Sequence, residues 1–182
     1  VMYRGLIGTA LMMIVAQARG QSLKTTLPAA HFWRSAVGVA SLALWFHAIS
    51  GLPLATGMTL NYMSSVWMAV FLIGGAIALG SARVDGRLVA TVLVGFAGVA
   101  LVLKPTMAQD QWGAGLAGLL SGMLAALAYL QVTALARSGE PEIRIVFYFS
   151  LGTVIVGAAI AIATHGFHAH TLRGALLLLA TG

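Results

Sequence analysis

The chain has 182 residues, of which 60% are apolar and only 8% are charged. Soluble domains carry about 25% charged residues and leave much of their surface in water, so this composition excludes a soluble globular protein. The net charge of +6 would suit nucleic-acid binding, but the cations are spread through short connections rather than gathered on one face. The chain has no cysteine, which excludes disulfides and thiolate metal sites within it.

Residues 35–82 contain no Asp, Glu, Lys or Arg. A helix crosses the bilayer core in about 20 residues, so this run is too long for one span and suits two. The segment Ser50-Gly51-Leu52-Pro53 interrupts it with a flexible residue and with one that cannot continue a helix. We therefore predict a helical hairpin that turns around Gly51 and Pro53.

The other predicted helices fall between charged residues. In chain order, the predicted spans are 5–18, 32–50, 54–80, 88–103, 116–136 and 145–164, with 172–182 as the start of a seventh. The span 88–103 is only about 24 Å long, but Arg87 and Lys104 at its ends can snorkel to the interfaces. None of these runs shows the period-two alternation of membrane strands. The predicted fold is therefore all-α, a polytopic transmembrane helical bundle.

The cations predict the orientation. One side of the membrane receives most of them, namely Arg19, Lys24, Arg34, Arg83, Arg87, Arg137 and Arg144, and the other side receives Arg4, Lys104 and Arg173. The positive-inside rule places the larger group in the cytoplasm. We thus expect a multi-pass protein of the plasma membrane with the Gly51–Pro53 turn outside.

Both ends of the chain are expected to lie inside a longer sequence. It begins with Val1, without the basic and hydrophobic regions of a signal peptide, and it ends at Gly182 within an apolar run.

A weak internal similarity bears on the architecture. The segment His-Phe-Trp-Arg-Ser-Ala at 31–36 recurs in form as His-Thr-Leu-Arg-Gly-Ala at 170–175, and Arg4 before the first span matches Arg144 before the sixth. The paired segments are predicted on opposite sides of the membrane, as an inverted repeat with an odd number of helices per half would place them. Matches this short also arise by chance, so the repeat is a hypothesis.

Two segments carry a resemblance to a known family. Residues 46–65, Phe-His-Ala-Ile-Ser-Gly-Leu-Pro-Leu-Ala-Thr-Gly-Met-Thr-Leu-Asn-Tyr-Met-Ser-Ser, resemble the small-aromatic-Ala-x-x-x-x-Pro-x-Ala-x-Ala turn and following helix of the EamA-like transporters in the drug/metabolite transporter superfamily. Leu79-Gly80 and residues 95–105 resemble the close of that family's first repeat. Two positions depart from the pattern: Ser81 replaces the acidic residue common after Leu-Gly, and Val66 replaces the proline common after the serine.

The resemblance implies a ten-helix carrier made of two inverted five-helix halves. By this analogy residues 1–105 are the first repeat without its first helix, and residues 113–182 begin the second. The chain would then be a fragment of the complete carrier.

No Asp or Glu lies inside a predicted span, because Asp85, Asp110, Glu140 and Glu142 all fall in connections. Buried carboxylates are the usual proton relays of membrane carriers. Proton coupling through this chain is therefore not expected unless His47 serves or helices outside the chain contribute. For His47, a snorkelling interfacial histidine is the preferred interpretation over a gate or proton site.

Polar residues on one face of the span 54–80 are the main candidates for a substrate path. Gly57, Asn61, Ser64, Ser65 and Met68 recur there at helical spacing. An asparagine in hydrocarbon needs a partner or a wet cavity, so Asn61 either bonds a neighbouring helix or borders the path. If Asn61 borders the path, the candidate residues are Asn61, Tyr62 and Ser65 on this span, Trp45 and His47 across the hairpin, and Tyr129 and Gln131 on the span 116–136. Tyr148 is a weaker candidate, because an interfacial aromatic residue is equally expected at its position.

Two further patterns favour structural roles. The glycine pairs Gly118/Gly122, Gly95/Gly98 and Gly74/Gly75 are interpreted as sites of close helix packing rather than as hinges. His165, His168 and His170 lie close enough in sequence to bind a transition metal. Because no carboxylate or cysteine lies near them, we interpret them as interfacial polar residues and predict neither a metal nor a cofactor.

The predicted function is a carrier that moves small organic metabolites or amphipathic compounds by alternating access. Its expected partners are that small molecule and the lipid bilayer, without nucleic acid. The first alternative is an intramembrane enzyme, but Ser121-Gly122 lacks the glycine spacing of a serine hydrolase elbow. A non-transporting membrane assembly protein is the second alternative. The sequence predicts neither the substrate nor the direction, coupling ion or oligomeric state.

Overall fold

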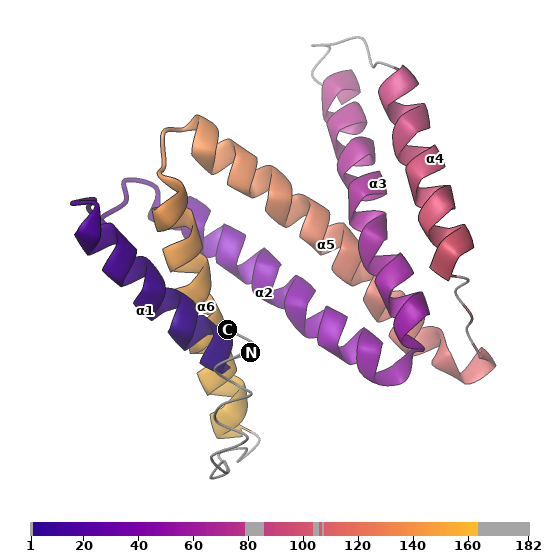
Figure 1. Cartoon of the computed structure of the whole chain (residues 1–182), viewed down its shortest axis with the longest axis horizontal. Coiled ribbons are helices and arrows are strands. Elements are labelled where there is room, and N and C mark those ends of the chain that lie inside the picture. The colour runs from indigo at the N-terminus through magenta and orange to yellow at the C-terminus, as the bar shows by residue number, and fades with distance from the viewer. Residues whose placement is uncertain (1, 79–85, 104–105, 107, 164–182) are drawn as a thin grey trace. The chain divides into compact units, whose positions relative to one another are not determined.

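The computed structural model describes residues 2–78, 86–103, 106 and 108–163 (Figure 1). Over these residues the chain is helical and contains no strand, which confirms the all-α prediction. The elements are α1 (Met2–Ala18), α2 (Pro28–Gly51), α3 (Leu54–Ala78), α4 (Gly86–Leu103), the 3₁₀ helix η1 (Gln109–Gln111), α5 (Trp112–Arg137) and α6 (Glu142–Ala163). The predicted start of a seventh helix, and the histidines at 165, 168 and 170, lie outside the described residues.

Four of the helices, α2, α3, α5 and α6, are long and apolar enough to cross a membrane. Helix α1 has 17 residues and α4 has 18, which is the short end of the length that a membrane span needs. Helices satisfy their own backbone hydrogen bonds and therefore suit hydrocarbon. The chain has the architecture of a multi-pass membrane protein.

The predicted hairpin turn is confirmed. Helix α2 ends at Gly51, and α3 begins at Leu54 directly after Pro53. The Pro53 carbonyl accepts the first hydrogen bond of α3, from the Gly57 amide at 3.0 Å. The proline thus occupies a position where its missing amide hydrogen has no cost.

Helices α1 and α5 end with the same motif. Gly20 has φ of 60° and Gly139 has φ of 83°, a backbone conformation that glycine adopts without strain. After each glycine the chain turns back, so that the amides of Gln21 and Glu140 bond carbonyls of Ala16 and Leu135 in the last helical turn. These caps direct the connection 19–27 and the connection 138–141 away from their helices.

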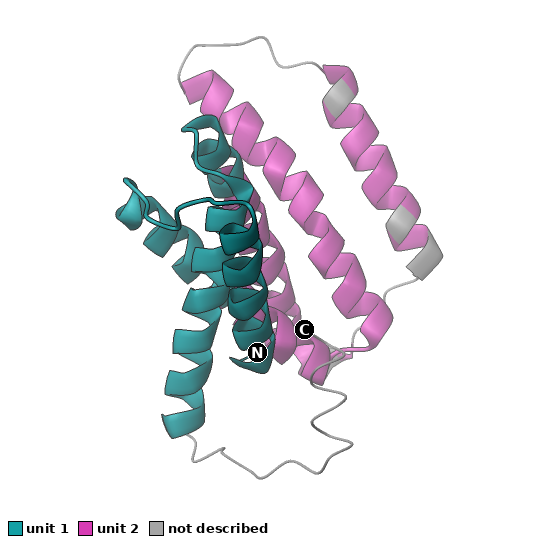
Figure 2. Cartoon of the chain, turned by 60° about the vertical axis from the view of Figure 1, so that its left-hand side comes forward, with its two compact units in different colours: residues 1–39, 131–182 teal, residues 40–130 magenta. Residues whose placement is uncertain are grey.

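The chain divides into two compact units (Figure 2). Unit 1 comprises residues 1–39 and 131–182, and unit 2 comprises residues 40–130. The two predicted repeats, at 1–105 and 113–182, concern a relationship between sequences. The division into compact units does not test that relationship, so the repeats stay a prediction.

Within unit 1, α1 packs along α6. A Cβ atom built at Gly5 would lie 2.9 Å from the Ser150 carbonyl oxygen, and one at Gly157 would lie 2.9 Å from Met2 Cβ. The first turns of α2 join this pair, since Ser35 Oγ donates a 3.1 Å hydrogen bond to the Tyr148 carbonyl of α6. Small residues thus bring three helix backbones close together.

Within unit 2, α3 packs against α4, and the remaining parts of α2 and α5 form an apolar cluster with α3. Ala48 and Leu52 of α2 and Ala117 of α5 are buried at its centre, and Leu44, Leu60 and Ala114 pack around them. This cluster fixes the ends of the helices that line the cavity described below.

Candidate functional site

A reciprocal pair of hydrogen bonds joins α2 to α5 in unit 2. Ser41 Oγ donates to the Ser121 carbonyl and Ser121 Oγ donates to the Ser41 carbonyl, both at 2.9 Å. Both serines are buried. From the sequence Ser121 is only a possible nucleophile, whereas in the structure its hydroxyl donates a hydrogen bond to a neighbouring helix and has a packing role.

Helices α5 and α3 approach closely beside this pair. A Cβ atom built at Gly122 would lie 2.8 Å from the Leu60 carbonyl oxygen, and one at Gly118 would lie 2.8 Å from Leu60 Cδ1. The predicted packing role of these two glycines is confirmed. At the other predicted packing sites, Gly74, Gly75, Gly95 and Gly98, a Cβ would meet no described atom within 4 Å, so the expected close approach is not found in the described part of the chain.

The predicted substrate-path residues on the hairpin of α2 and α3 differ in how much of each residue is exposed. Asn61 and Trp45 are half-buried, whereas His47, Tyr62 and Ser65 are exposed. The Trp45 ring lies across the hairpin at the level of Gly57, where a built Cβ would be 3.7 Å from Trp45 Cζ3. The backbone of Asn61, one turn further along α3, faces Gly122 of α5. The structure thus brings Trp45 and Asn61 to neighbouring levels of α3, and their role in a substrate path stays a prediction.

The two candidates on α5 differ in character. The Tyr129 side chain is exposed, with 52% of its surface accessible. Gln131 is half-buried, and its Oε1 atom is buried without a hydrogen-bond partner among the described residues. A buried amide oxygen without a partner is costly, which suits a group that meets a ligand or water. Trp67 Nε1 on α3 is in the same situation and escaped the sequence analysis, because tryptophan in an apolar span is expected simply as bulk.

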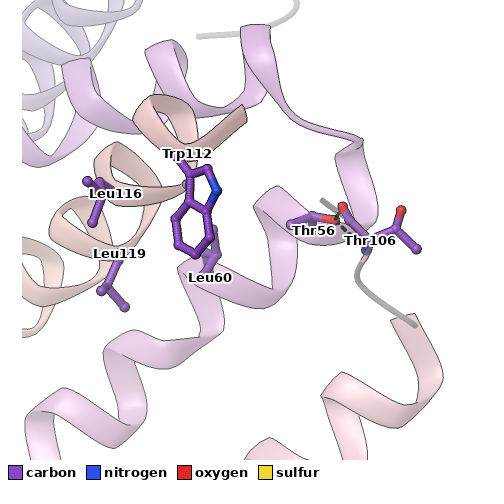
Figure 3. A pocket seen from close by; sticks show the side chains of 7 residues that line it. Thr56, Leu60, Thr106, Trp112, Leu116 and Leu119 are labelled. Carbon is purple, nitrogen blue, oxygen red and sulfur yellow. Dashed lines mark hydrogen bonds between the residues drawn. The ribbon is translucent and has the colours of Figure 1, made fainter. Parts of the chain in front are cut away.

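A cavity of about 250 Å³ opens in unit 2 near the starts of α3 and α5 (Figure 3). Its wall is mainly apolar and is formed by Thr56, Leu60, Thr106, Trp112, Gly115, Leu116 and Leu119. The Thr56 hydroxyl donates to the Thr106 carbonyl at 2.5 Å and accepts from the Thr106 amide at 2.9 Å. Because these polar groups already satisfy each other, the cavity suits an apolar group. The substrate-path candidates predicted from the sequence do not line it.

A cluster of ionisable side chains lies at one end of unit 1 and was missed by the sequence analysis. Glu140, in the connection 138–141, is only 6% exposed. Its carboxylate accepts hydrogen bonds from Thr25 Oγ1 at 2.7 Å and from Arg144 Nη1 at 2.8 Å, and His31 Nε2 lies 3.3 Å from its Oε2. Glu140 lies outside the helices, as the sequence predicts, but nothing local in the sequence indicates that this connection residue is buried.

The surroundings of Glu140 act in opposite directions on its protonation. Burial alone would raise the pKa of this carboxyl group, because a low-dielectric environment disfavours the charge. The hydrogen bonds from Thr25 and Arg144, the nearby His31 ring and the charge of Arg144 outweigh burial and hold the pKa below its usual value. The carboxylate is therefore ionised near neutral pH.

The same cluster fixes the connection 19–27. Arg144 Nη2 donates a 2.8 Å hydrogen bond to the Ser22 carbonyl, and the Tyr148 hydroxyl donates a 3.1 Å bond to the Leu23 carbonyl. The Tyr148 ring lies 4.6 Å from the His31 ring, centroid to centroid. Tyr148, a weaker substrate-path candidate in the sequence, thus has a positioning role that joins α6 to the backbone of this connection.

The chain is similar along its whole length to two curated proteins. It is 30% identical over 183 aligned residues to the pseudopaline exporter CntI of Pseudomonas aeruginosa strain PAO1 and 29% identical over 182 residues to the protein of that name from strain UCBPP-PA14. The match covers 100% of this chain and 62% of each relative, so the chain spans less than two thirds of their length. No protein-family model matches the chain, and no solved structure does. The relatives are named as exporters, and the chain is similar to a segment of each of them.

Proposed function

We propose that the chain is part of an exporter of small organic compounds, of the EamA-like kind within the drug/metabolite transporter superfamily. The observation that carries this proposal is the similarity to named exporters over 100% of the chain. The hairpin at Gly51–Pro53, through which the sequence resembles that family, is present in the structure and supports it.

The proposed mechanism is alternating access, in which helices rock around a site near the middle of the membrane. Asn61 is the proposed polar contact on α3, with Trp45 beside it across the hairpin. Gln131 of α5, whose Oε1 atom is buried without a hydrogen-bond partner among the described residues, is retained as a separate candidate for a polar contact with the substrate. Polar and aromatic groups of this kind suit a small metabolite bound by hydrogen bonds and ring contacts rather than by paired charges.

The environment of Ser121 bears on the enzyme alternative. A nucleophilic serine needs an accessible hydroxyl and an adjacent base. Ser121 has 0% exposure, and its hydroxyl donates to a backbone carbonyl. These features favour the carrier over a serine hydrolase centred on this residue.

Transport by the full-length protein tests the proposal. The purified protein is reconstituted into liposomes, and counterflow is measured for pseudopaline, the cargo in the relatives' name, and for a panel of small metabolites. We expect flux of at least one compound. No flux of any compound, with the protein folded and inserted, would contradict the carrier function.

The variant Asn61→Leu tests the proposed site. Losing a hydrogen bond to the substrate costs about 1 kcal/mol or more, so flux at low substrate concentration should fall by about fivefold or more. The matched control is Met63→Leu, a volume-conserving change at a half-buried position of the same helix, which should retain flux. Equal flux in both variants would remove Asn61 from the site.

A further inference from the structure

The connection 19–27 is held mainly by polar contacts to α6 and to Glu140. Most of its side chains are exposed, and only Leu23 and Thr25 are half-buried. Its Ser22 and Leu23 carbonyls accept hydrogen bonds from Arg144 and Tyr148, and its Thr25 hydroxyl bonds Glu140. Polar contacts of this kind can be exchanged for water at a membrane surface, whereas apolar packing cannot.

Glu140 is the centre of these contacts. Its carboxylate meets the connection through Thr25, α2 through His31 and α6 through Arg144. Arg144 in turn holds the Ser22 carbonyl. Removing this one negative charge would therefore weaken the attachment of three segments simultaneously, because all three make their contacts with the same carboxylate.

We propose that Glu140, His31 and Arg144 form a latch that closes the end of unit 1 by holding the connection 19–27 against the start of α6, and that opens during the working cycle of the protein. The inference rests on the proposed transport function, in which each end of the bundle must open in one of two states. Gly20 and Gly139, both with positive φ, lie within the two connections directly after helices α1 and α5. Residues at helix termini are where opening motions are absorbed.

Acid should open the latch and neutral pH should keep it closed. The titratable and charged groups that face Glu140 are His31 from α2 and Arg144 from α6, with Tyr148 of α6 against the His31 ring, and Thr25 from the connection does not titrate. Because the pKa of Glu140 is lowered in the folded state, the stabilisation is present above the usual glutamate pKa. It is lost as the pH falls through the lowered value.

A distance measurement tests the latch without any substrate. Spin labels are attached to cysteines introduced at the exposed residues Lys24 and Ser138 of the full-length protein in lipid, and the distribution of distances is measured at neutral pH. We expect a major short distance and a minor longer one. The variant Glu140→Gln should make the longer distance dominant, a shift of about tenfold or more in the ratio of populations, since hydrogen bonds to a charged group are stronger than those to a neutral one.

Matched variants separate the latch from a static anchor. Glu142→Gln removes a carboxylate from an exposed position two residues away and should leave the distribution unchanged. Glu140→Asp should restore part of the short distance, and the unsubstituted protein should shift to the longer distance only in acid. A single distance that is unchanged in Glu140→Gln, or equal shifts in Glu140→Gln and Glu142→Gln, would overturn the proposal. Since the readout needs no transported compound, failure of the latch can be distinguished from failure of the transport function.

Discussion

The serine pair illustrates how single residues hold the helices of this protein together. Ser41 and Ser121 exchange hydrogen bonds to each other's backbone, at a place where no water competes. We expect Ser121→Ala to lower the free energy of unfolding by about 0.6 kcal/mol, the typical value for such bonds between membrane helices. The double variant Ser41→Ala/Ser121→Ala should cost about twice as much, because the two bonds have separate donors and acceptors. Unfolding of the full-length protein in mixed detergent micelles measures these differences.

Ser50→Ala is the matched control for the pair. Ser50 is exposed, and its hydroxyl bonds the His47 carbonyl of its own helix at 2.8 Å. Its removal deletes a hydroxyl without separating two helices, so the stability should change little. If Ser121→Ala and Ser50→Ala have the same effect, the bonds between α2 and α5 do not contribute to stability.

At the scale of elements, the contact of α5 with α3 depends on the absence of a side chain at Gly122. In Gly122→Ala the new methyl group would lie 2.8 Å from the Leu60 carbonyl oxygen, and a backbone atom cannot move aside alone. We expect the unfolding free energy to fall by about 1–3 kcal/mol, as for other overpacked sites. The same unfolding measurement checks this expectation.

Gly75→Ala provides the control on α3. A methyl group there would meet no described atom within 4 Å. The change should be neutral or should stabilise the helix by up to about 1 kcal/mol, through helix propensity. Gly122→Ala gains the same propensity, so the difference between the two variants isolates the effect of the contact. Equal free energies of unfolding for Gly122→Ala and Gly75→Ala would mean that α3 and α5 can move apart without loss of stability.

The elements also show what the sequence can predict. The turn at Gly51–Pro53 follows from span length and from proline, both of which are local, and it was predicted correctly. The helix starts were placed too late: α2 begins at Pro28 and α5 at Trp112, where the sequence predicted residues 32 and 116. The predicted bounds are those of the apolar segments that would cross the hydrocarbon core. A helix can continue beyond this core into the interface, as long as its backbone hydrogen bonds are satisfied.

The latch could not be predicted, because its contacts join residues that are far apart in the sequence. Thr25 and Glu140 are separated by 115 positions in the chain, and burial of the carboxylate depends on that contact. A charged residue between two predicted spans is expected to face water. Only the arrangement of α2, α6 and their connections shows that Glu140 is buried. The same limit applies to the cavity, whose wall combines residues from α3, α5 and the segment between α4 and α5.

At the scale of the whole molecule, the connections fall into two sets according to the hydrogen bonds that hold them. The connections 19–27 and 138–141, joined through Glu140, precede α2 and follow α5. The turn 51–53 follows α2, and the segment at Thr106, bonded to Thr56, precedes α5. If α2 and α5 each cross the membrane once, as we propose, the two sets lie on opposite sides. The first set carries Arg19 and Lys24, next to Arg137 and Arg144, which predicts that it is cytoplasmic.

Single cysteines in the full-length protein test this orientation. Ser50→Cys and Ser138→Cys place thiols at exposed positions at opposite ends, in a segment that has no cysteine of its own. A maleimide that does not cross membranes should label Ser50→Cys in intact cells and leave Ser138→Cys unlabelled, and inverted vesicles should give the reverse pattern. Labelling of both from the same side would contradict the three crossings, by α3, α4 and α5, that the proposed topology places between the two positions. An exchanged pattern would retain this topology and reverse the orientation. The latch would then close the outer end rather than the cytoplasmic end, so this measurement also determines which compartment its opening exposes.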